Sequence, residues 1–307
     1  MPGGRAGTAC LVAAPAGVAL AWLLATPDGP DPAAAVRALS DLLGSTVLGL
    51  CVLSWLQRDD RRPAVPHARL WRPLSVTAAA WAATELILLV AAASEVAVGA
   101  LTPAAFGRFI GGISVGQVGA ATVLCAAAVA VAAALGHRSD STRSVTPVAA
   151  VAAVALLARP VTGHMSAQVL GSALVAAHVL AAALWFGPLV AMAWLLRGRS
   201  PWATLLPRYS TLAWKCVAVL AVTGIVDGAV ALGGPGALVD TGYGRILLAK
   251  AVALAGLAAL GWWWRRTWVP AAATHRATER ESLRRSTIEV VALAVVFGLA
   301  AGLATTG

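Results

Sequence analysis

Apolar runs long enough to cross a lipid bilayer follow one another along almost the whole chain. A transmembrane helix needs about 20 consecutive, mostly apolar residues. Such runs lie at approximately residues 8–26, 33–56, 74–98, 112–135, 146–159, 168–196, 209–232, 245–264 and 286–305. Lipid cannot hydrogen-bond an exposed backbone, and no run alternates in the manner of an isolated strand, so each run is predicted to be a helix. The expected fold class is an all-α, polytopic transmembrane helix bundle of about nine spans.

The composition excludes an ordinary soluble domain. Hydrophobic residues make up 59% of the 307 residues and charged residues only 12%, about half the charged fraction of a soluble domain. In a soluble protein the formal charge of +10 would indicate nucleic acid as a partner. Here the charges fall in short loops, and no stripe of Lys and Arg with interleaved aromatic residues occurs. We therefore expect the lipid bilayer as the partner, and no nucleic acid.

The placement of the basic residues predicts the orientation. If the N-terminus is cytoplasmic, 18 of the 23 Lys and Arg residues lie on the cytoplasmic side, as the positive-inside rule requires. The five on the other side are Arg37, Arg108, Arg159, Arg245 and Lys250. This asymmetry predicts a plasma (inner) membrane protein with its N-terminus inside and its C-terminus outside. The first run is either an uncleaved helix or a signal peptide, and the lack of a clean small-x-small cleavage site favours the helix.

Three ionisable residues are candidates for an intramembrane charge or proton path, because a charge in hydrocarbon needs a partner or a function. Asp227 and Lys250 lie at similar depths near the outer ends of the seventh and eighth runs. We predict a buried ion pair that either fixes the helix register or takes part in transport. Glu85 lies near the middle of the third run with no obvious cation at its depth. It is predicted to be a neutral, hydrogen-bonded carboxyl or part of a proton or cation path.

Two further acids, Asp41 and Glu289, also lie in apolar runs. Glu289 follows Arg284 and Arg285 near the cytoplasmic face, where we predict an interfacial charge pair. The four cysteines are far apart within apolar runs and form no CxxC pattern. Neither a disulfide framework nor a zinc site is therefore expected.

The histidines are the most informative residues. Three of the five lie in basic loops, whereas His164 and His178 bracket the outer part of the sixth run. They are two heptads apart, so they would share one face of a continuous helix, on which Trp185 and Met192 follow. Imidazole and thioether ligands, with Met165 beside His164, suit copper. An intramembrane histidine is also often only a hydrogen-bonding residue between helices.

The distance between His164 and His178 along the helix limits this interpretation. Fourteen helical residues span ~21 Å, so His164 and His178 could not bind one ion on a continuous helix. For both histidines to bind copper, the chain would need two separate sites along one path, or a loop that folds back and brings His164 toward His178.

Several short segments of the second half form a recognisable pattern. They are Thr162-Gly163-His164, His178-Val-Leu-Ala-Ala-Ala-Leu-Trp185-Phe-Gly187, Arg208-Tyr209-Ser210, Thr223-Gly224, Thr241-Gly-Tyr243-Gly244-Arg245-Ile-Leu-Leu-Ala-Lys250, and Leu283-Arg284-Arg285-Ser286 continuing to Glu289. With these segments the chain resembles the copper resistance protein D (CopD) family of inner-membrane copper-handling proteins. The resemblance is good over residues 158–307 and looser over residues 70–135.

The resemblance implies copper transport across, or copper handling at, the plasma membrane, in copper resistance or homeostasis. The copper ion, Cu(I) or Cu(II), would be the substrate or bound ligand. His164 would receive it on the outer side, His178 would be a deeper site, and Met165 and Met192 would be auxiliary ligands for Cu(I). The family-motif residues are Trp185, Gly187, Tyr243, Gly244 and Arg245. The resemblance also implies a small outer copper-binding partner of the CopC type.

Two alternatives stay open. A non-transporting copper scaffold or oxidase assembly factor would need the same outer site. A membrane redox protein would bind a quinone near Trp185 or a haem, although haem ligation normally takes one histidine from each of two facing helices. The sequence holds no phosphate-binding loop, and we expect no enzyme. We divide the chain into residues 1–145 with four spans and a CopD-like region, residues 146–307, with five spans, in one structural unit.

Overall fold

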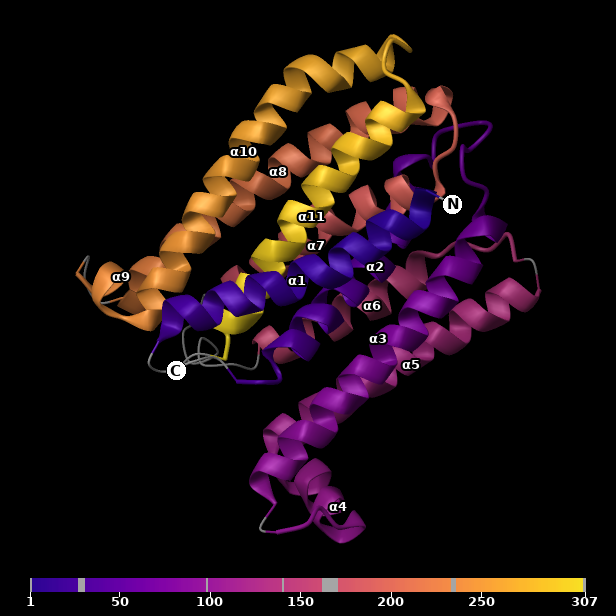
Figure 1. The fold of residues 1–307 in the computed structure, drawn as a ribbon. Helices are drawn as coiled ribbons and strands as arrows, with labels where there is room; N and C mark the ends of the chain where they lie inside the picture. The colour runs from indigo at the N-terminus through magenta and orange to yellow at the C-terminus, as the bar shows by residue number, and fades with distance from the viewer. Residues whose placement is uncertain are drawn as a thin grey trace.

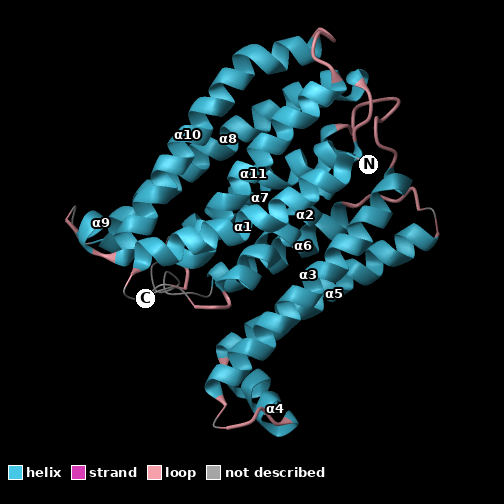
Figure 2. Cartoon of the chain, viewed as in Figure 1, coloured by secondary structure: helices cyan, strands magenta, loops and turns pink. Residues whose placement is uncertain are grey.

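The chain is helical throughout the part that the structure describes. The computed structural model describes residues 2–26, 31–97, 99–139, 141–161, 171–232 and 236–305, and no strand occurs within these ranges (Figure 2). The long helices are α1 (Pro2–Ala25), α2 (Ala34–Leu56), α3 (His67–Val96), α5 (Ser114–Arg138), α6 (Thr146–Val161), α7 (Gly171–Leu195), α8 (Arg199–Leu232), α10 (Gly242–Ala273) and α11 (Glu279–Leu303). Two short helices were not predicted, α4 (Pro103–Gly112) and α9 (Ala237–Asp240).

Each of the nine predicted runs contains a long helix, so the all-α prediction is confirmed. Seven of the described helices are long and apolar enough to cross a membrane, and two shorter apolar stretches, Ala13–Ala25 and Thr146–Pro160, accompany them. The protein is therefore a multi-pass membrane protein. The span count of nine and the orientation of the termini stay predictions.

Four helices extend beyond their predicted apolar runs by seven residues or more. Helix α3 begins at His67, α8 begins at Arg199, α10 continues to Ala273, and α11 begins at Glu279. Hydropathy detects only the part of a helix that suits hydrocarbon, whereas Arg, Glu and Ala in the added turns are good helix formers in water as well. The start of α11 is also capped, because the Thr278 hydroxyl accepts a hydrogen bond from the Glu281 backbone N–H at 3.1 Å.

Helix α2 is the central element of the bundle. It packs against α1, α3, α6, α7 and α11, and it is the most buried of the seven candidate spans. Helix α8 packs between α7 and α10, while α10 lies at the edge and is the most exposed span (Figure 1). The peripheral helices thus turn most of their apolar surface outward, as expected for helices that contact lipid.

The first and last helices pack closely along their length. A Cβ atom on Gly17 would lie 2.2 Å from the Val295 carbonyl oxygen, so no larger residue fits at this crossing of α1 and α11. Close approach through small residues is the usual way in which membrane helices associate. The start of α1 and the end of α11 lie at opposite ends of the bundle, and α4 and α9 lie at the end where α11 finishes (Figure 1).

Candidate functional site

His178 lies inside α7, in its half nearer the end where α9 lies, and contacts α8. Its ring nitrogen Nδ1 is 2.8 Å from the Thr223 hydroxyl oxygen. Gly224 follows Thr223, and a Cβ atom on Gly224 would approach His178 Cε1 to 3.8 Å. The sequence segments around His178 and Thr223-Gly224 therefore meet in space, although 45 residues separate the two side chains.

The hydrogen bonds of Thr223 are the basis on which we assign the tautomer of His178. The Thr223 hydroxyl donates to the Val219 carbonyl oxygen at 2.7 Å, which uses its single proton. In this arrangement Thr223 accepts from His178, so we assign a proton to Nδ1; in a neutral ring Nε2 then keeps its lone pair. Metal-binding histidines are typically held in this way, with one nitrogen fixed by a hydrogen bond and the other free to ligate.

Two charged residues of the predicted path lie near His178. The Lys250 ammonium acts electrostatically on both His178 and Asp227. However, no ion pair joins Lys250 to Asp227 in the described part of the chain, so the predicted pair is not formed as a direct contact. The three residues form a loose polar group on α7, α8 and α10.

The other predicted metal ligands are not brought to His178. His164 and Met165 lie outside the described residues. Met192 is completely buried in α7, 14 residues and therefore ~21 Å from His178 along the helix. In the part of the chain that the structure describes, no three His, Cys, Asp or Glu side chains are placed to hold a metal ion together.

The motif at the start of α10 has a structural role. The Thr241 hydroxyl accepts from the Gly244 N–H at 3.0 Å, capping the helix. A Cβ atom on Gly244 would lie 2.0 Å from the Ala237 carbonyl oxygen, which explains the glycine. Arg245 donates to the carbonyl oxygens of Leu24 and Thr26 at 2.7 and 2.8 Å. It thereby ties α10 to the end of α1, while Tyr243, half-buried, lies within electrostatic reach of Asp227.

A second polar group lies around Trp185, one heptad from His178. The Trp185 indole N–H donates to Glu289 Oε1 at 2.9 Å, and the Tyr209 hydroxyl donates to the Trp185 carbonyl oxygen at 3.0 Å. All three residues are buried. The predicted interfacial pair of Glu289 with Arg284 or Arg285 is wrong, because Glu289 turns into the bundle and Arg285 pairs with Glu281 instead.

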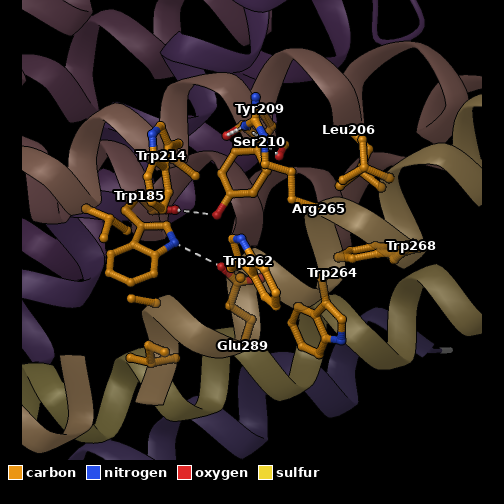
Figure 3. Close-up of a pocket in the computed structure, with 16 residues that line it drawn as sticks. Trp185, Leu206, Tyr209, Ser210, Trp214, Trp262, Trp264, Arg265, Trp268 and Glu289 are labelled. Atoms are coloured by element: carbon orange, nitrogen blue, oxygen red, sulfur yellow. Dashed lines mark hydrogen bonds between the residues drawn. The ribbon is translucent and has the colours of Figure 1, made fainter. Parts of the chain in front are cut away.

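A pocket opens beside this group, between α8 and α10 (Figure 3). Trp185 and Glu289 form its buried inner wall, and Trp214 and Trp262, each about half exposed, form its rim. Trp264 and Trp268 line the side formed by α10, where their rings meet edge to face at 5.6 Å. The pocket is thus walled by aromatic rings around one buried carboxyl group.

Glu85 belongs to a third group, which connects α2, α3 and α6. Its Oε2 lies 2.8 Å from the Arg159 guanidinium, and its Oε1 accepts from the Ser40 hydroxyl at 2.6 Å. The expectation that no cation lies at the depth of Glu85 is therefore wrong. Arg159 lies near the end of its predicted run, but its long side chain reaches a carboxyl from a neighbouring helix. Asp41 and Arg37 are also within electrostatic reach.

No positioning role was predicted from the sequence for three residues that hold the candidates in place, namely Thr223, Tyr209 and Arg159. A signal existed for the first two. Tyr209, Cys216 and Thr223 are spaced seven residues apart on α8. This spacing puts them on one face of the helix, as it does for His178 and Trp185 on α7. No such signal marks Arg159, because its partner is 74 residues away in the chain.

Two family models match the chain. Residues 26–171 match the model described as copper resistance protein D-like, N-terminal domain, and residues 203–303 match the model described as copper resistance protein D. The second match includes Tyr209, Thr223, Lys250 and Glu289, and the first includes Glu85 and Arg159. Comparisons with curated proteins and with solved structures give no significant match.

Proposed function

Since the chain belongs to the copper resistance protein D family, which handles copper at the membrane in copper resistance, we propose that it moves copper across the plasma membrane by way of His178. His178 is the deeper copper-binding site of this path, and His164 with Met165 is the outer site that receives the ion. Met192 is a soft ligand further along α7, and the path is not a single cluster. A CopC-type partner outside the membrane would deliver the ion.

The observation that carries this proposal is the fixed tautomer of His178. Because the Thr223 hydroxyl is already committed to the Val219 carbonyl oxygen, the His178 ring donates through Nδ1 and offers Nε2 as a neutral ligand. Nε2 has no hydrogen-bond partner among the described residues. A neutral imidazole nitrogen that is available in this way can bind a copper ion in either oxidation state.

The orientation of the protein sets the direction of the path. With 18 of 23 basic residues at one end, we place the start of α1 in the cytoplasm. His178 then lies in the outer half of the bilayer, since α7 begins at the outer end. An inside-negative potential favours inward movement of a copper cation by ~2.3 kcal/mol per charge and 100 mV.

Copper uptake into proteoliposomes tests the proposal. Vesicles with the native chain, His178→Ala or His137→Ala are given Cu(I) under reducing conditions, and both bound and internal copper are measured. His137 is the matched control, because it is exposed at the end of α5. We expect native vesicles and the His137 variant to accumulate copper, and the His178 variant to lose uptake at least tenfold.

The same experiment separates the alternatives. Copper that binds but never crosses would support a scaffold or assembly factor and contradict transport. Uptake that is unchanged in His178→Ala would remove His178 from the path. A visible absorption band from the purified protein would indicate a haem and favour a redox function.

A further inference from the structure

Glu289 of α11 is a buried carboxyl group surrounded by neutral partners. Only 6% of the residue is exposed, and its Oε1 accepts from the Trp185 indole N–H at 2.9 Å. The Tyr209 hydroxyl lies close to the same carboxyl. Because this hydroxyl donates its single proton to the Trp185 carbonyl oxygen at 3.0 Å, it faces Glu289 as an acceptor, which suits a carboxyl group that carries a proton.

The helices packed against α11 bring no cation to Glu289. Among the residues that the structure describes, Glu289 has no ion-pair partner, and Arg285, one turn earlier on α11, pairs with Glu281. The described side chains of α1 include no titratable group. The titratable or charged groups of the other neighbours on this side of the bundle are Cys51 of α2, His178 of α7, Tyr209 and Cys216 of α8, and Arg265 of α10. Thiols and phenols carry no positive charge, and His178 is one heptad, ~10 Å, from Trp185.

The two arginines beside the α8–α10 pocket are held by other partners. Arg265 donates to the Ser210 carbonyl oxygen at 3.0 Å, and the Arg266 guanidinium lies 4.0 Å from the centre of the Trp262 ring. Both arginines are exposed. A carboxylate at Glu289 would therefore be a buried charge without a countercharge, which is costly in a membrane protein. The geometry leaves a proton as the countercharge.

The pocket gives water a route to this carboxyl group (Figure 3). Its cavity of about 40 Å³ exceeds the roughly 10–15 Å³ that one water molecule needs, and a buried water also needs a few polar partners. Tyr209 and Glu289 supply them at the inner wall, and Ser210 and Arg265 supply them nearer the rim. Since a guanidinium is costly in hydrocarbon, Arg265 marks the end of the pocket that lies at the water interface. In the orientation given above, that interface is cytoplasmic.

We propose that Glu289 is a proton-binding site, that water in the pocket exchanges its proton with the cytoplasmic side, and that copper uptake requires this proton to leave. The first two parts stand on the geometry of Glu289 and the pocket, and the third rests on the proposed function. In the step itself the carboxyl O–H bond breaks and the proton passes to a water molecule in the pocket, which leaves the carboxylate.

The position of Glu289 explains how its proton and copper are coupled. A carboxylate has to gain water, so release of the proton opens the hydrogen-bonded group that joins α11 to Trp185 of α7 and Tyr209 of α8. His178 and Thr223, which form the proposed copper site, lie on the same two helices. A change in the packing of α7 and α8 at one site therefore biases the other, and such coupling acts in both directions.

Infrared spectra of the purified full chain without copper test the proton site. A protonated carboxyl group has a carbonyl stretching band that a carboxylate lacks. The spectrum of Glu289→Gln is subtracted from that of native protein at pH 7, so that the bands of other acids cancel. We expect a band from Glu289 that shifts when D₂O replaces H₂O. Glu281→Gln is the control, because it removes the acid of α11 that is paired with Arg285, and it should give no such band. If the band is missing from native protein, Glu289 is ionised and the proton site is wrong.

Gly261→Leu tests the water route. Gly261 lines the pocket, and an added Cβ atom meets nothing within 4 Å, so the larger side chain fills the pocket without displacing a neighbour. This variant should keep the band of Glu289 but slow its shift in D₂O at least tenfold. Gly256→Leu is the matched control, since it adds the same side chain to α10 at an open position outside the pocket. Equal exchange rates in the two variants would contradict the route. The comparison also stays informative if Glu289→Gln does not fold.

Copper uptake at different internal pH tests the coupling. The proteoliposomes hold the chain with its cytoplasmic end inside, and the external pH is fixed so that the outer side of the protein is unchanged. Native uptake should rise with internal pH, because the proton then leaves more readily. Glu289→Gln has no proton to release, so its uptake should be at least tenfold lower and independent of internal pH. Glu281→Gln should follow native protein.

The outcomes distinguish this inference from the proposed function. If native protein and Glu289→Gln take up copper equally and with the same dependence on internal pH, the coupling is wrong and the proposed function stands. If native protein moves no copper, the proposed function fails and the coupling fails with it. The infrared band of Glu289 and its exchange in D₂O decide on the proton site in either case, because they are measured without copper.

Discussion

Gly187 of α7 lies directly against Gly49 of α2, with backbone touching backbone. A Cβ atom on Gly187 would lie 2.0 Å from the Ser45 carbonyl oxygen, and one on Gly49 would lie 1.9 Å from the Gly187 carbonyl carbon. The Gly187 of the family motif is thus explained by packing and not by a ligand. The crossing holds α7, and with it His178 and Trp185, against the central helix of the bundle.

Gly187→Ala should therefore destabilise the protein, because the added methyl group meets backbone that cannot move aside. Overpacking of this kind costs about 1–3 kcal/mol, and we expect a lower melting temperature in detergent. Gly256→Ala is the control, since nothing lies within 4 Å of its added Cβ atom, and alanine favours the helix by up to about 1 kcal/mol. Equal melting temperatures for the two variants would contradict the close crossing.

Thr223→Val should reduce copper uptake without unfolding the protein. Valine keeps the shape of threonine but cannot accept the proton of His178 Nδ1, so the ring loses its fixed tautomer. Loss of such an outer-shell partner typically costs 10–100-fold in metal affinity or activity. Thr223→Ser should retain uptake.

The matched control for this effect is Thr122→Val. Thr122 is as buried as Thr223 and also donates to a carbonyl oxygen four residues earlier, that of Val118 at 2.9 Å. It should keep native uptake. If both valine variants lose uptake equally, the loss comes from the helices and not from the histidine.

The positions of the long helices could be predicted from the sequence because lipid permits few other structures. A run of apolar residues in a membrane must satisfy its own backbone, so hydropathy alone finds the helix. The ends could not be found in the same way. Arg199 and Glu279 begin helices whose first turns lie beyond the apolar runs, where composition no longer separates helix from loop.

The polar contacts between helices could be predicted only in part. The sequence identified Glu85 and Glu289 as costly residues, which is a local property. It did not identify their partners, because Arg159 and Trp185 lie 74 and 104 residues away, and the pairing depends on which helices are neighbours. The seven-residue spacing of His178, Trp185 and Met192 predicted that they share one face of α7. It did not predict which helices that face contacts.

Removing one member of the Glu85 and Arg159 pair should destabilise the protein more than removing both. Glu85→Gln removes the carboxylate that lies against the Arg159 guanidinium. Removing one partner of a buried ion pair lowers the free energy of unfolding by about 3–5 kcal/mol. The lower end is expected here, because the Arg159 side chain is 24% exposed. The double variant Glu85→Gln with Arg159→Gln should recover part of the loss. Additive effects in unfolding experiments would contradict a coupled pair.

The contact between Asp60 and Arg208 should make stability depend on pH. Asp60 lies in the loop after α2, and Arg208 donates to both of its carboxylate oxygens, at 2.7 and 2.8 Å. These hydrogen bonds lower the pKa of Asp60 below its ordinary value of 3.8. A carboxyl with a lowered pKa in the folded protein stabilises it above the pKa of the unfolded chain, and this contribution is lost as the pH falls through the folded pKa.

We therefore expect the native protein to be more stable than Asp60→Asn at pH 7, by about 1 kcal/mol at most because the pair is partly exposed. The two proteins should converge as the pH falls below about 4, since the unfolded Asp60 then begins to take up its proton. Melting temperatures in detergent between pH 3 and pH 7 would measure this. Asp59→Asn is the control, because Asp59 is 85% exposed and, among the described residues, its ion pair is with its neighbour Arg58 and not with Arg208. A difference between native protein and Asp60→Asn that stays constant over the whole range would mean that the Arg208 contact leaves the Asp60 charge unaffected.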